Sequence, residues 1–248
     1  MNVSVKHEKQ KVGKKTKLPP APTKLFGLPN ADKDGWHESY DDNSASENLA
    51  RYPHPFRACV LGRVNSGKSL VAKFILMAHQ AHKPKFQNVY VVHGSTKTQE
   101  YDCIEPTDVF DDIPSYEDFD ESKKTLLIID DLDYTAFTRE QLKRLSELFR
   151  FGSTHHNISI ILLHQVFVRV PKIARDCCNV FIIYRPVDLD SLDTVGRRIG
   201  LKKEQVRYIF KELMPHYRDS LCVNLIPGAP HKYLKNVYEP LELPFDVA

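Results

Sequence analysis

The chain has 248 residues, of which 42% are hydrophobic, and a formal net charge of +3. This is enough apolar material for one full-sized α/β domain with an appendage. No apolar run approaches the length that crosses a bilayer, and the basic N-terminus lacks the apolar middle of a secretory signal. We therefore expect a soluble protein without membrane contacts. The five cysteines are odd in number and form no C-x-x-C pair, which favours a reducing compartment and argues against a structural zinc site.

The positive charge is concentrated at the start of the chain. Residues 1–24 contain seven Lys and one Glu, about +6, which leaves about −3 for the rest. We expect residues 1–50 to be a basic, largely disordered arm and residues 51–248 to be a folded domain. The arm's "KVGKKTK" fits a nuclear localisation signal, a DNA-binding arm or a solvating tail. In the folded domain, contact with nucleic acid would require a local basic patch.

Strands and helices are predicted to alternate in the first half of the domain. A strand over 56–62 precedes a glycine-rich loop, and a helix follows with apolar spacing at Leu70, Phe74, Met77 and Ala81. A second strand covers 88–94. The interval between Lys97 and Lys123 holds ten Asp or Glu and no Lys or Arg, so it predicts an acidic, exposed connection.

The second half continues the alternation. The segment "KTLLIIDDL" predicts a strand that is buried on both faces. A helix follows over 138–152, with a capping box at Thr138 and Gln141 and a stop at Gly152. The remaining elements are a strand over 157–165, a short helix over 171–178, a strand over 179–185, helices near 188–198 and 201–214, and a hairpin formed by 220–227 and 232–238.

Alternation of this kind predicts an α/β fold with parallel strands and right-handed crossovers. With the loop described next, the expected fold is a three-layer P-loop NTPase of the RecA-like type, with a central, mostly parallel sheet and a C-terminal hairpin. One whole strand lies in sequence between the loop and "LLIIDD". This suggests a sheet in which the strand that carries the acids is not the immediate sequence neighbour of the strand before the loop. RecA-like and AAA-type motors are arranged in that way.

The segment "GRVNSGKS", residues 62–69, fits the phosphate-loop pattern between a strand and a helix. Its backbone N–H groups would wrap the β-phosphate of ATP, the Lys68 ammonium would reach the β- and γ-phosphates, and the Ser69 hydroxyl would bind Mg²⁺. The bland alternative is an ordinary glycine-rich turn. The residues expected to contact the nucleotide are Gly62, Arg63, Val64, Asn65, Ser66, Gly67, Lys68, Ser69 and Leu70.

Polar residues end two later strands. Asp130 would hold Mg²⁺ through water, and Asp131 would orient or deprotonate the attacking water. Alternatively, both acids merely start a turn that Asp133 continues. Gln165 could contact both the γ-phosphate and the lytic water, or it could be a polar residue at the point where a strand surfaces.

The segments "GRVNSGKS", "LLIIDD", "LFRFGSTHHNISIILLHQ" and "RDCCNVFIIYR" resemble, in order and spacing, viral genome-packaging ATPases of the poxvirus type. Iridoviruses, virophages and Polinton-like elements share this family, which belongs to the FtsK/HerA superfamily. The resemblance covers about residues 55–225. It implies an ATP-driven homo-oligomeric ring that pumps double-stranded DNA into a preformed capsid, in the virion or in the cytoplasm or nucleus of the host cell. The implied partners are DNA of any sequence, further copies of the chain and a capsid or portal-vertex protein.

Carried over by matching motif, Lys68 and Ser69 bind nucleotide and Mg²⁺, Asp130 supports the metal, Asp131 is the catalytic acid and Gln165 is the sensor. Much of the superfamily has Glu at the Asp131 position, and the "DD" form resembles the viral branch. The family also implies a basic residue delivered by a neighbouring subunit. Arg150 is the first candidate, although Ser153 and Thr154 stand near the place where another Arg is expected; Arg144 and Arg185 are the others.

A basic stretch follows Gly196. Its members Arg197, Arg198, Lys202, Lys203 and Arg207 could line a DNA-facing surface or form the solvated face of a helix. Two other functions stay open at this level. One is a non-translocating ATPase switch in DNA replication or transposition, and the other is a capsid-associated structural protein with a degenerate site.

Overall fold

A computed structural model describes residues 38, 40, 48–94, 99–185 and 189–245. These residues belong to one compact unit, Asp34–Ala248, and residues 1–33 lie outside the described residues. Most of the predicted arm, residues 1–50, therefore also lies outside them. Within the described ranges, no helix is long and apolar enough to span a membrane.

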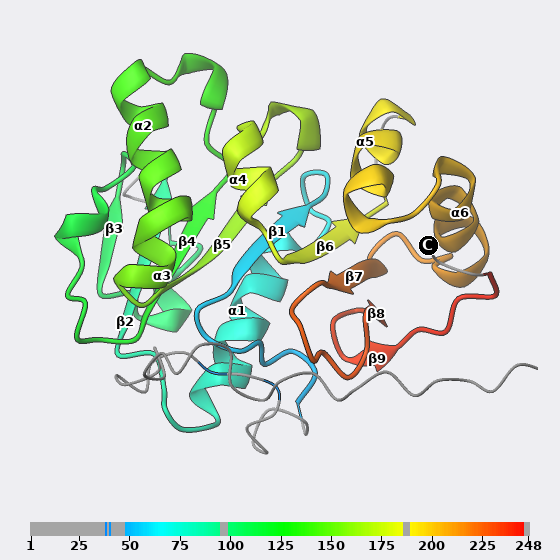
Figure 1. Cartoon of the computed structure of the whole chain (residues 1–248), viewed down its shortest axis with the longest axis horizontal. Coiled ribbons are helices and arrows are strands. Elements are labelled where there is room, and N and C mark those ends of the chain that lie inside the picture. Colours follow the sequence, from blue (N-terminus) through cyan, green and yellow to red (C-terminus); the bar gives the residue numbers. More distant parts are fainter. Residues whose placement is uncertain (1–37, 39, 41–47, 95–98, 186–188, 246–248) are drawn as a thin grey trace, which may run out of the picture. The chain divides into compact units, whose positions relative to one another are not determined.

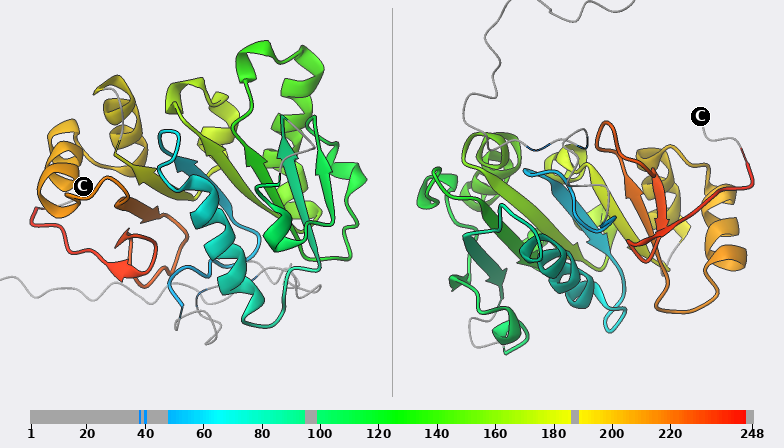
Figure 2. Two further views of the ribbon diagram at one scale, coloured as in Figure 1. Left: turned by 180° about the vertical axis from the view of Figure 1, so that it is seen from behind. Right: turned by 90° about the horizontal axis from the view of Figure 1, so that it is seen from below.

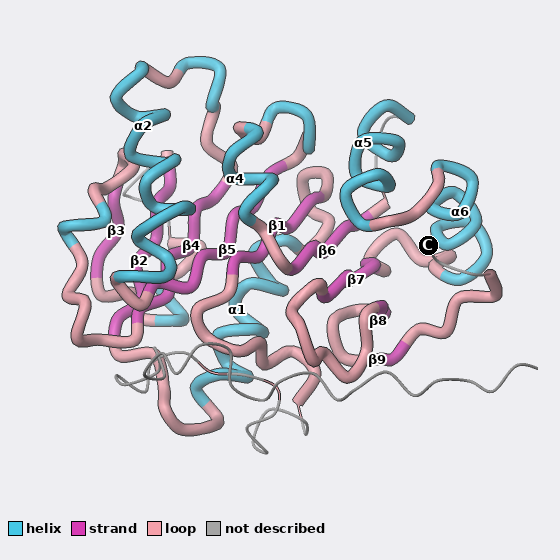
Figure 3. The backbone as a smooth tube through the Cα atoms, viewed as in Figure 1, coloured by secondary structure: helices cyan, strands magenta, loops and turns pink. Residues whose placement is uncertain are grey.

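Nine strands and six α-helices occur in the described part of the chain, joined by short 3₁₀ and π turns (Figures 1 and 3). The strands are β1 (Arg57–Leu61), β2 (Asn88–His93), β3 (Asp108–Phe110), β4 (Thr125–Asp130), β5 (Ile158–His164), β6 (Val180–Tyr184), β7 (Ser220–Asn224), β8 (Tyr233–Lys235) and β9 (Glu239–Pro240). The helices are α1 (Lys68–Gln80), α2 (Arg139–Glu147), α3 (Ser153–His155), α4 (Lys172–Cys177), α5 (Leu189–Ile199) and α6 (Lys203–Tyr208). The turns are η1 (Asp102–Ile104), η2 (Tyr116–Asp118), η3 (Tyr134–Ala136), η4 (Leu148–Gly152), η5 (Phe167–Arg169) and η6 (Ile209–Leu213).

The strands form a single sheet in the order β3-β2-β4-β5-β1-β6-β7-β8-β9. The first six are parallel, and the last three are antiparallel. Strand β5 lies between β1, which precedes the glycine-rich loop, and β4, which carries the paired acids. The carboxyl ends of β1, β5 and β4 therefore meet at one edge. The predicted P-loop NTPase fold with a mostly parallel sheet and a C-terminal hairpin is confirmed.

Each strand contributes to two hydrophobic cores because successive side chains point to opposite faces. On β1, Cys59 and Leu61 belong to one core, while Ala58 and Val60 belong to the other. The first core packs beneath α2, α4, α5 and α6, and the second beneath α1. Figure 2 shows α1 on the opposite side of the sheet from α2 and α4. The result is the expected three-layer arrangement.

The predicted apolar face of α1 is wrong, although the helix itself is present. The side chains of Leu70, Phe74 and Met77 are 68%, 41% and 66% exposed, and Ala81 is also exposed. The buried face is instead made by Val71, Ala72, Ile75, Leu76, Ala78 and His79. The helix is apolar around most of its circumference, so sequence spacing alone does not identify the face that packs on the sheet.

The predicted helix stop at Gly152 is also wrong. Helix α2 passes through the π turn η4 into α3 and ends at His155, before Asn157 adopts a left-handed φ of 52°. Gly152 is needed for packing, since a Cβ there would lie 2.6 Å from Tyr116 Cβ. The predicted capping box is confirmed: Gln141 N donates to Thr138 Oγ1 at 3.2 Å, and Thr138 N donates to Gln141 Oε1 at 2.8 Å.

The described residues of the predicted arm, 38, 40 and 48–50, pack on the domain, and Ala50 is fully buried in the second core. The Glu38 carboxylate forms an ion pair of 2.5 Å with the buried Lys124 ammonium and a longer one of 3.7 Å with Arg51. The Tyr40 hydroxyl accepts a hydrogen bond of 2.5 Å from Asn224 Nδ2. A buried ammonium needs such a partner, so Glu38 is part of the domain's polar interior.

Candidate active site

The glycine-rich loop joins β1 to α1 at the carboxyl edge of the sheet. Two of its residues have left-handed backbone conformations, Asn65 with a φ of 61° and Gly67 with a φ of 108°. A Cβ on Gly62 would meet Ser66 Oγ at 2.4 Å and the Tyr184 ring at 3.0 Å. The spacing of the two glycines is therefore imposed by a tight turn and by close packing.

Tyr184, the last residue of β6, packs against this loop. Its hydroxyl donates a hydrogen bond of 3.1 Å to the Gly67 carbonyl oxygen. Burial raises the pKa of Tyr184 to about 12, so the hydroxyl keeps its proton and remains a donor. The sequence marked Tyr184 only as part of an apolar strand, because nothing in a strand pattern reveals which residue will lie beneath a loop.

The centre of the loop has the polar groups that an anion requires. The Lys68 side chain is 8% exposed, and its ammonium donates to the carbonyl oxygens of Gly62 at 3.0 Å and Arg63 at 3.1 Å. Ser66 Oγ is buried and has no hydrogen-bond partner among the described residues. Arg63, Val64 and Asn65 are exposed around this centre. A buried, unsatisfied hydroxyl beside an ammonium and the start of a helix fits the phosphates of a nucleotide.

Tyr101 joins the two residues predicted to hold the metal. Its hydroxyl donates a hydrogen bond of 2.7 Å to Asp130 Oδ2, and the Ser69 side chain is close enough to lower the pKa of the tyrosine against the larger opposing effect of burial. Burial first, and then the neighbouring Asp130 charge, raise the pKa of Tyr101 well above its ordinary value. Ser69 on α1 and Asp130 at the end of β4 are therefore brought to the same place. Hard oxygen donors of this kind fit Mg²⁺.

Asp130 is only 6% exposed at its position on β4. Burial raises the pKa of its carboxyl group, while the hydrogen bond from Tyr101 opposes this effect. A cation at this position would compensate for the loss of solvation of the carboxylate. Tyr101 escaped the sequence analysis because it lies in the acidic connection, where no motif marks it.

Asp131 lies beside two polar residues from the end of β5. Gln165 Nε2 donates a hydrogen bond to Asp131 Oδ2, and His164 Nδ1 lies 3.3 Å from Asp131 Oδ1. The backbone of Asp131 adopts a left-handed φ of 46°, so the extended conformation of β4 ends at this residue. His164 first, and then Gln165 and the Lys68 charge, hold the pKa of Asp131 below its usual range. The carboxylate is therefore ionised at neutral pH.

The structure brings the predicted groups of the phosphate loop, β4 and β5 into one site. The Lys68 ammonium is near enough to act on Asp131, and Tyr101 connects Ser69 with Asp130. His164 is a member of this site that the sequence analysis did not single out. Its place one residue before Gln165 was the available signal, but alternating residues of a strand usually face opposite sides.

A cavity of about 190 Å³ opens beside Asp131 and Gln165, with Arg169 on its wall. Its lining residues are Asp131, Leu132, Asp133, Tyr134, His164, Gln165, Val166 and Arg169. Arg169 is exposed, and its charge adds to the hydrogen bonds from Thr135 that lower the pKa of the Asp133 carboxyl group. This arginine of the same chain was not among the predicted basic residues.

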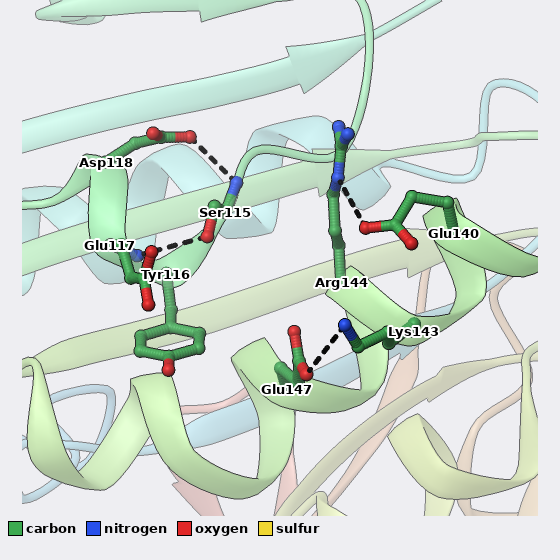
Figure 4. Close-up of a pocket in the computed structure, with 8 residues that line it drawn as sticks. All are labelled: Ser115, Tyr116, Glu117, Asp118, Glu140, Lys143, Arg144 and Glu147. Atoms are coloured by element: carbon green, nitrogen blue, oxygen red, sulfur yellow. Dashed lines mark hydrogen bonds and ion pairs between the residues drawn. The ribbon is translucent and has the colours of Figure 1, made fainter.

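The three predicted arginines have other surroundings in the same chain. Arg144 forms ion pairs with Asp112 and Glu140 at 3.6 Å each, beside a largely acidic pocket of about 460 Å³ between η2 and α2 (Figure 4). Arg185 donates to the carbonyl oxygens of Phe210 and Met214. Arg150 is exposed in η4, and its charge is close enough to influence the Cys177 thiol. Cys177 ends α4, just before β6 begins. Arg150 thus lies toward the opposite edge of the sheet from the phosphate loop.

Two of the basic residues after Gly196 line a further cavity. A cavity of about 290 Å³ between α4 and α5 is lined by four basic residues, one acid, Phe167 and Thr194; the charged ones are Lys172, Arg175, Asp176, Arg197 and Arg198. Arg198 donates to the Asp176 carbonyl oxygen at 2.5 Å. Lys202 and Arg207 are exposed at α6, and Lys203 is half-buried there. Two of the five predicted residues, Arg197 and Arg198, therefore belong to one basic groove.

Comparison with known proteins agrees with this geometry. The sequence model of the family described as "Poxvirus A32 protein" matches residues 115–214. This interval contains β4, β5 and the paired acids. No curated protein has a matching sequence.

Solved structures share the fold. The genome-packaging NTPase B204 of Sulfolobus turreted icosahedral virus 2, in complex with sulfate, is 16% identical with a TM-score of 0.53, and the match covers 75% of this chain and 97% of that chain. The same NTPase in complex with AMPPCP is 17% identical with a TM-score of 0.52, over 75% and 98% of the two chains. The pCW3 conjugation coupling protein TcpA is 14% identical with a TM-score of 0.51, over 84% and 70%. The phosphate loop, the paired acids and these matches show that the chain has a P-loop NTPase fold similar to that of the viral genome-packaging NTPase B204 and of TcpA, and that residues 115–214 are similar to the poxvirus A32 protein family.

Proposed function

We propose that the protein is an ATP-driven translocase that packages double-stranded viral DNA into a capsid and works as a homo-oligomeric ring. The observation that carries the proposal is the position of Asp131, an ionised carboxylate that accepts a hydrogen bond from Gln165 and lies beside His164 and near the phosphate-loop Lys68. A simple nucleotide-binding fold does not need a second acid with its own supporting residues at this point.

The described side chains have distinct roles in this proposal. Lys68 and the N–H groups of residues 63–69 bind the phosphates of ATP, and Ser69 and Asp130 hold Mg²⁺, which neutralises charge on the phosphates. Asp131 accepts a hydrogen bond from the attacking water and orients it, or takes its proton. Gln165 donates a hydrogen bond to Asp131 and directly follows β5. In this proposal, a change in the position of the Asp131 carboxylate is passed through this hydrogen bond to β5.

A positive charge is expected to stabilise the transition state from a neighbouring subunit. Arg150 suits this role because it is exposed and lies toward the edge opposite its own phosphate loop. Arg144 and Arg185 are engaged within their own chain. Arg169, on the wall of the cavity beside Asp131, is a candidate from the same subunit.

The groove between α4 and α5 supports DNA binding. Lys172, Arg175, Arg197 and Arg198 face the same depression with one acid, Asp176. Such a groove would bind phosphates without reading base sequence, as a translocase needs. The excess of positive charge is local, since the chain without its first 24 residues carries about −3.

The exposed face of α1 supports assembly with further copies. Leu70, Phe74 and Met77 lie on one side of the helix. The centres of the Phe74 ring and the exposed Tyr238 ring are 6.2 Å apart. Large apolar side chains in such a row are typical of surfaces that a partner covers. A capsid or portal-vertex protein is a further partner in this proposal, with the virion or the infected cell as the place of action.

The proposal is tested with the full-length protein, ATP, Mg²⁺ and linear duplex DNA that carries a triplex-forming strand as a roadblock. We expect ATP hydrolysis to rise several-fold with duplex DNA of any sequence, to lose this stimulation as salt increases, and to displace the third strand. Lys68→Ala should abolish all three effects. Closed rings threaded by DNA should appear by negative-stain imaging with a slowly hydrolysed ATP analogue.

Hydrolysis that ignores DNA and leaves the third strand in place would contradict translocation. If such hydrolysis rises instead with a replication or transposition protein, the protein is a switch of that kind.

A further inference from the structure

Three metal-ligating side chains meet at the carboxyl edge of the sheet, and none of them belongs to the phosphate loop. They are His93, Glu100 and Asp130, and one ligand atom from each lies within 4.8 Å of the other two. His93 is the last residue of β2, Glu100 precedes η1, and Asp130 is the last residue of β4. The grouping thus joins two neighbouring strands and the connection between β2 and β3.

The fold places these groups together by two separate means. His93 and Asp130 are register partners on the adjacent parallel strands β2 and β4, so their side chains project from the same face of the sheet. Glu100 is brought to that face by Lys73 of α1, whose ammonium donates a hydrogen bond of 2.5 Å to the Glu100 carbonyl oxygen and lies 5.3 Å from the centre of the Tyr101 ring. The buried Tyr101 hydroxyl fixes one oxygen of Asp130.

The donor set indicates a particular class of cation. Mg²⁺ prefers oxygen ligands and keeps several waters, whereas imidazole nitrogen is a ligand for first-row transition metals. One imidazole and two carboxylates form a mixed set of the kind that binds Mn²⁺, Fe²⁺ or Zn²⁺ with open positions for water. Metal–ligand distances of about 2.0–2.2 Å require donor atoms no more than about 4.4 Å apart. The three donor atoms already lie within 4.8 Å of one another, so binding requires only a small adjustment of these side chains.

We propose that His93, Glu100 and Asp130 form a binding site for a divalent transition-metal ion that fills without nucleotide and prefers Mn²⁺ to Mg²⁺. The site shares Asp130 with the magnesium site of the proposed function, but it uses neither Lys68 nor Ser69. Its occupancy therefore does not depend on whether the protein hydrolyses ATP or moves DNA.

The test uses the full-length protein without nucleotide and Mn²⁺ as the probe. Binding is followed by the loss of the electron paramagnetic resonance signal of free Mn²⁺. We expect one Mn²⁺ per chain, an excess of Mg²⁺ needed to displace it, and a pulsed-resonance coupling to a nitrogen nucleus. His93→Ala should remove the nitrogen coupling and weaken binding at least tenfold. Glu100→Gln, a surface change that leaves the fold intact, should also weaken binding at least tenfold.

Matched controls separate this site from the nucleotide site. His155→Ala removes an exposed histidine elsewhere and should bind Mn²⁺ like the unchanged protein. Lys68→Ala should keep Mn²⁺ binding and lose nucleotide binding, so a failure of the proposed ATPase role would leave this result standing. Absence of Mn²⁺ binding, unchanged affinity or nitrogen coupling in His93→Ala, or equal competition by Mg²⁺ would each overturn the inference.

Discussion

The hydroxyl of Tyr101 lies between Ser69 and Asp130 and donates a hydrogen bond of 2.7 Å to the Asp130 carboxylate. It connects the first turn of α1 with the end of β4, two segments about sixty residues apart in sequence. The ring is buried against α1, so the hydroxyl has a fixed position. The residues proposed to hold Mg²⁺ are thus oriented by a third side chain.

Removal of this hydroxyl should weaken metal binding in the ATP complex. Tyr101→Phe keeps the buried ring and deletes only the donor to Asp130, so the fold should be retained. We expect the Mg²⁺ concentration that gives half-maximal hydrolysis to rise on the order of tenfold, as is common when the partner of a metal ligand is lost. Titration of Mg²⁺ at saturating ATP measures this change. An unaltered Mg²⁺ requirement would show that the hydrogen bond has no role in orienting Asp130.

Asp131→Asn should separate ATP binding from hydrolysis. The amide is nearly isosteric but cannot accept a proton, so turnover should fall about 10²–10⁴-fold while nucleotide affinity stays nearly normal. Single-turnover phosphate release and binding of a fluorescent ATP analogue give the two quantities. Asp133→Asn is the matched control, because Asp133 caps η3 by accepting from Thr135 N and Asn can do the same. Normal turnover in Asp131→Asn would remove Asp131 from its proposed role.

Gly152→Ala should destabilise the fold. The added Cβ would lie 2.6 Å from Tyr116 Cβ, and the backbone of η4 must shift to relieve the contact. Overpacking of this kind costs about 1–3 kcal/mol in free energy of unfolding. Gly94→Ala is the control, since a Cβ there meets nothing within 4 Å. Urea denaturation of both variants compares them, and equal stabilities would contradict the packing argument.

Stability should depend on pH through His79. Its ring is buried between Phe56 and Phe86, and burial, followed by the charges of Lys124 and Arg51, lowers the pKa of His79 well below its usual value. The unfolded chain binds a proton below about pH 6.5, while the folded chain does not. The stabilisation is therefore complete above that pH and is lost as the pH falls, by about 1.4 kcal/mol per pH unit for this one group.

The pH effect of His79 is isolated by comparing two proteins. Denaturation of the unchanged chain and of His79→Gln between pH 7.5 and 5.5 should show a shallower pH dependence in the variant, because Gln does not titrate. Identical slopes would assign the pH dependence to other residues.

Phe74→Glu should reduce self-association without unfolding the protein. Phe74 is 41% exposed on the uncovered face of α1, so a charged side chain is tolerated there in a single chain. The same charge is costly where a second copy of the chain covers this face and removes it from water. Leu142→Glu is the control, because Leu142 is 39% exposed on α2, on the other side of the sheet. Sedimentation with an ATP analogue measures assembly. A variant that assembles like the unchanged protein would exclude this face from the interface.

Much of the fold could be predicted from the sequence because local patterns determine it. The apolar strands around residues 57–61, 125–130 and 158–164 and the capping box at Thr138 were readable from residue type and spacing. The exposed face of α1 and the passage of a helix through Gly152 were not. Both depend on what packs nearby, the sheet in one case and Tyr116 in the other.

The candidate site divides in the same way. The phosphate loop, Asp130, Asp131 and Gln165 follow strands and could be predicted from their positions. Tyr101, His164 and Tyr184 reach the site through contacts between distant segments, which no spacing reveals. The roles of Lys68, Asp131, Gln165 and Arg150 stay predictions until the variants are measured.

Residues at the end of β6 make hydrogen bonds to two other parts of the protein, the phosphate loop and the end of the helical segment formed by α6 and η6. Tyr184 holds the phosphate loop through the Gly67 carbonyl, and its neighbour Arg185 holds the carbonyls of Phe210 and Met214, where the helical segment that starts with α6 ends. Tyr184 and Arg185 are consecutive, so a single peptide unit separates the contact with the phosphate loop from the contact with the helical segment that carries Lys203 and Arg207. A phosphate that moved the loop would therefore act on the residue next to the attachment of that segment.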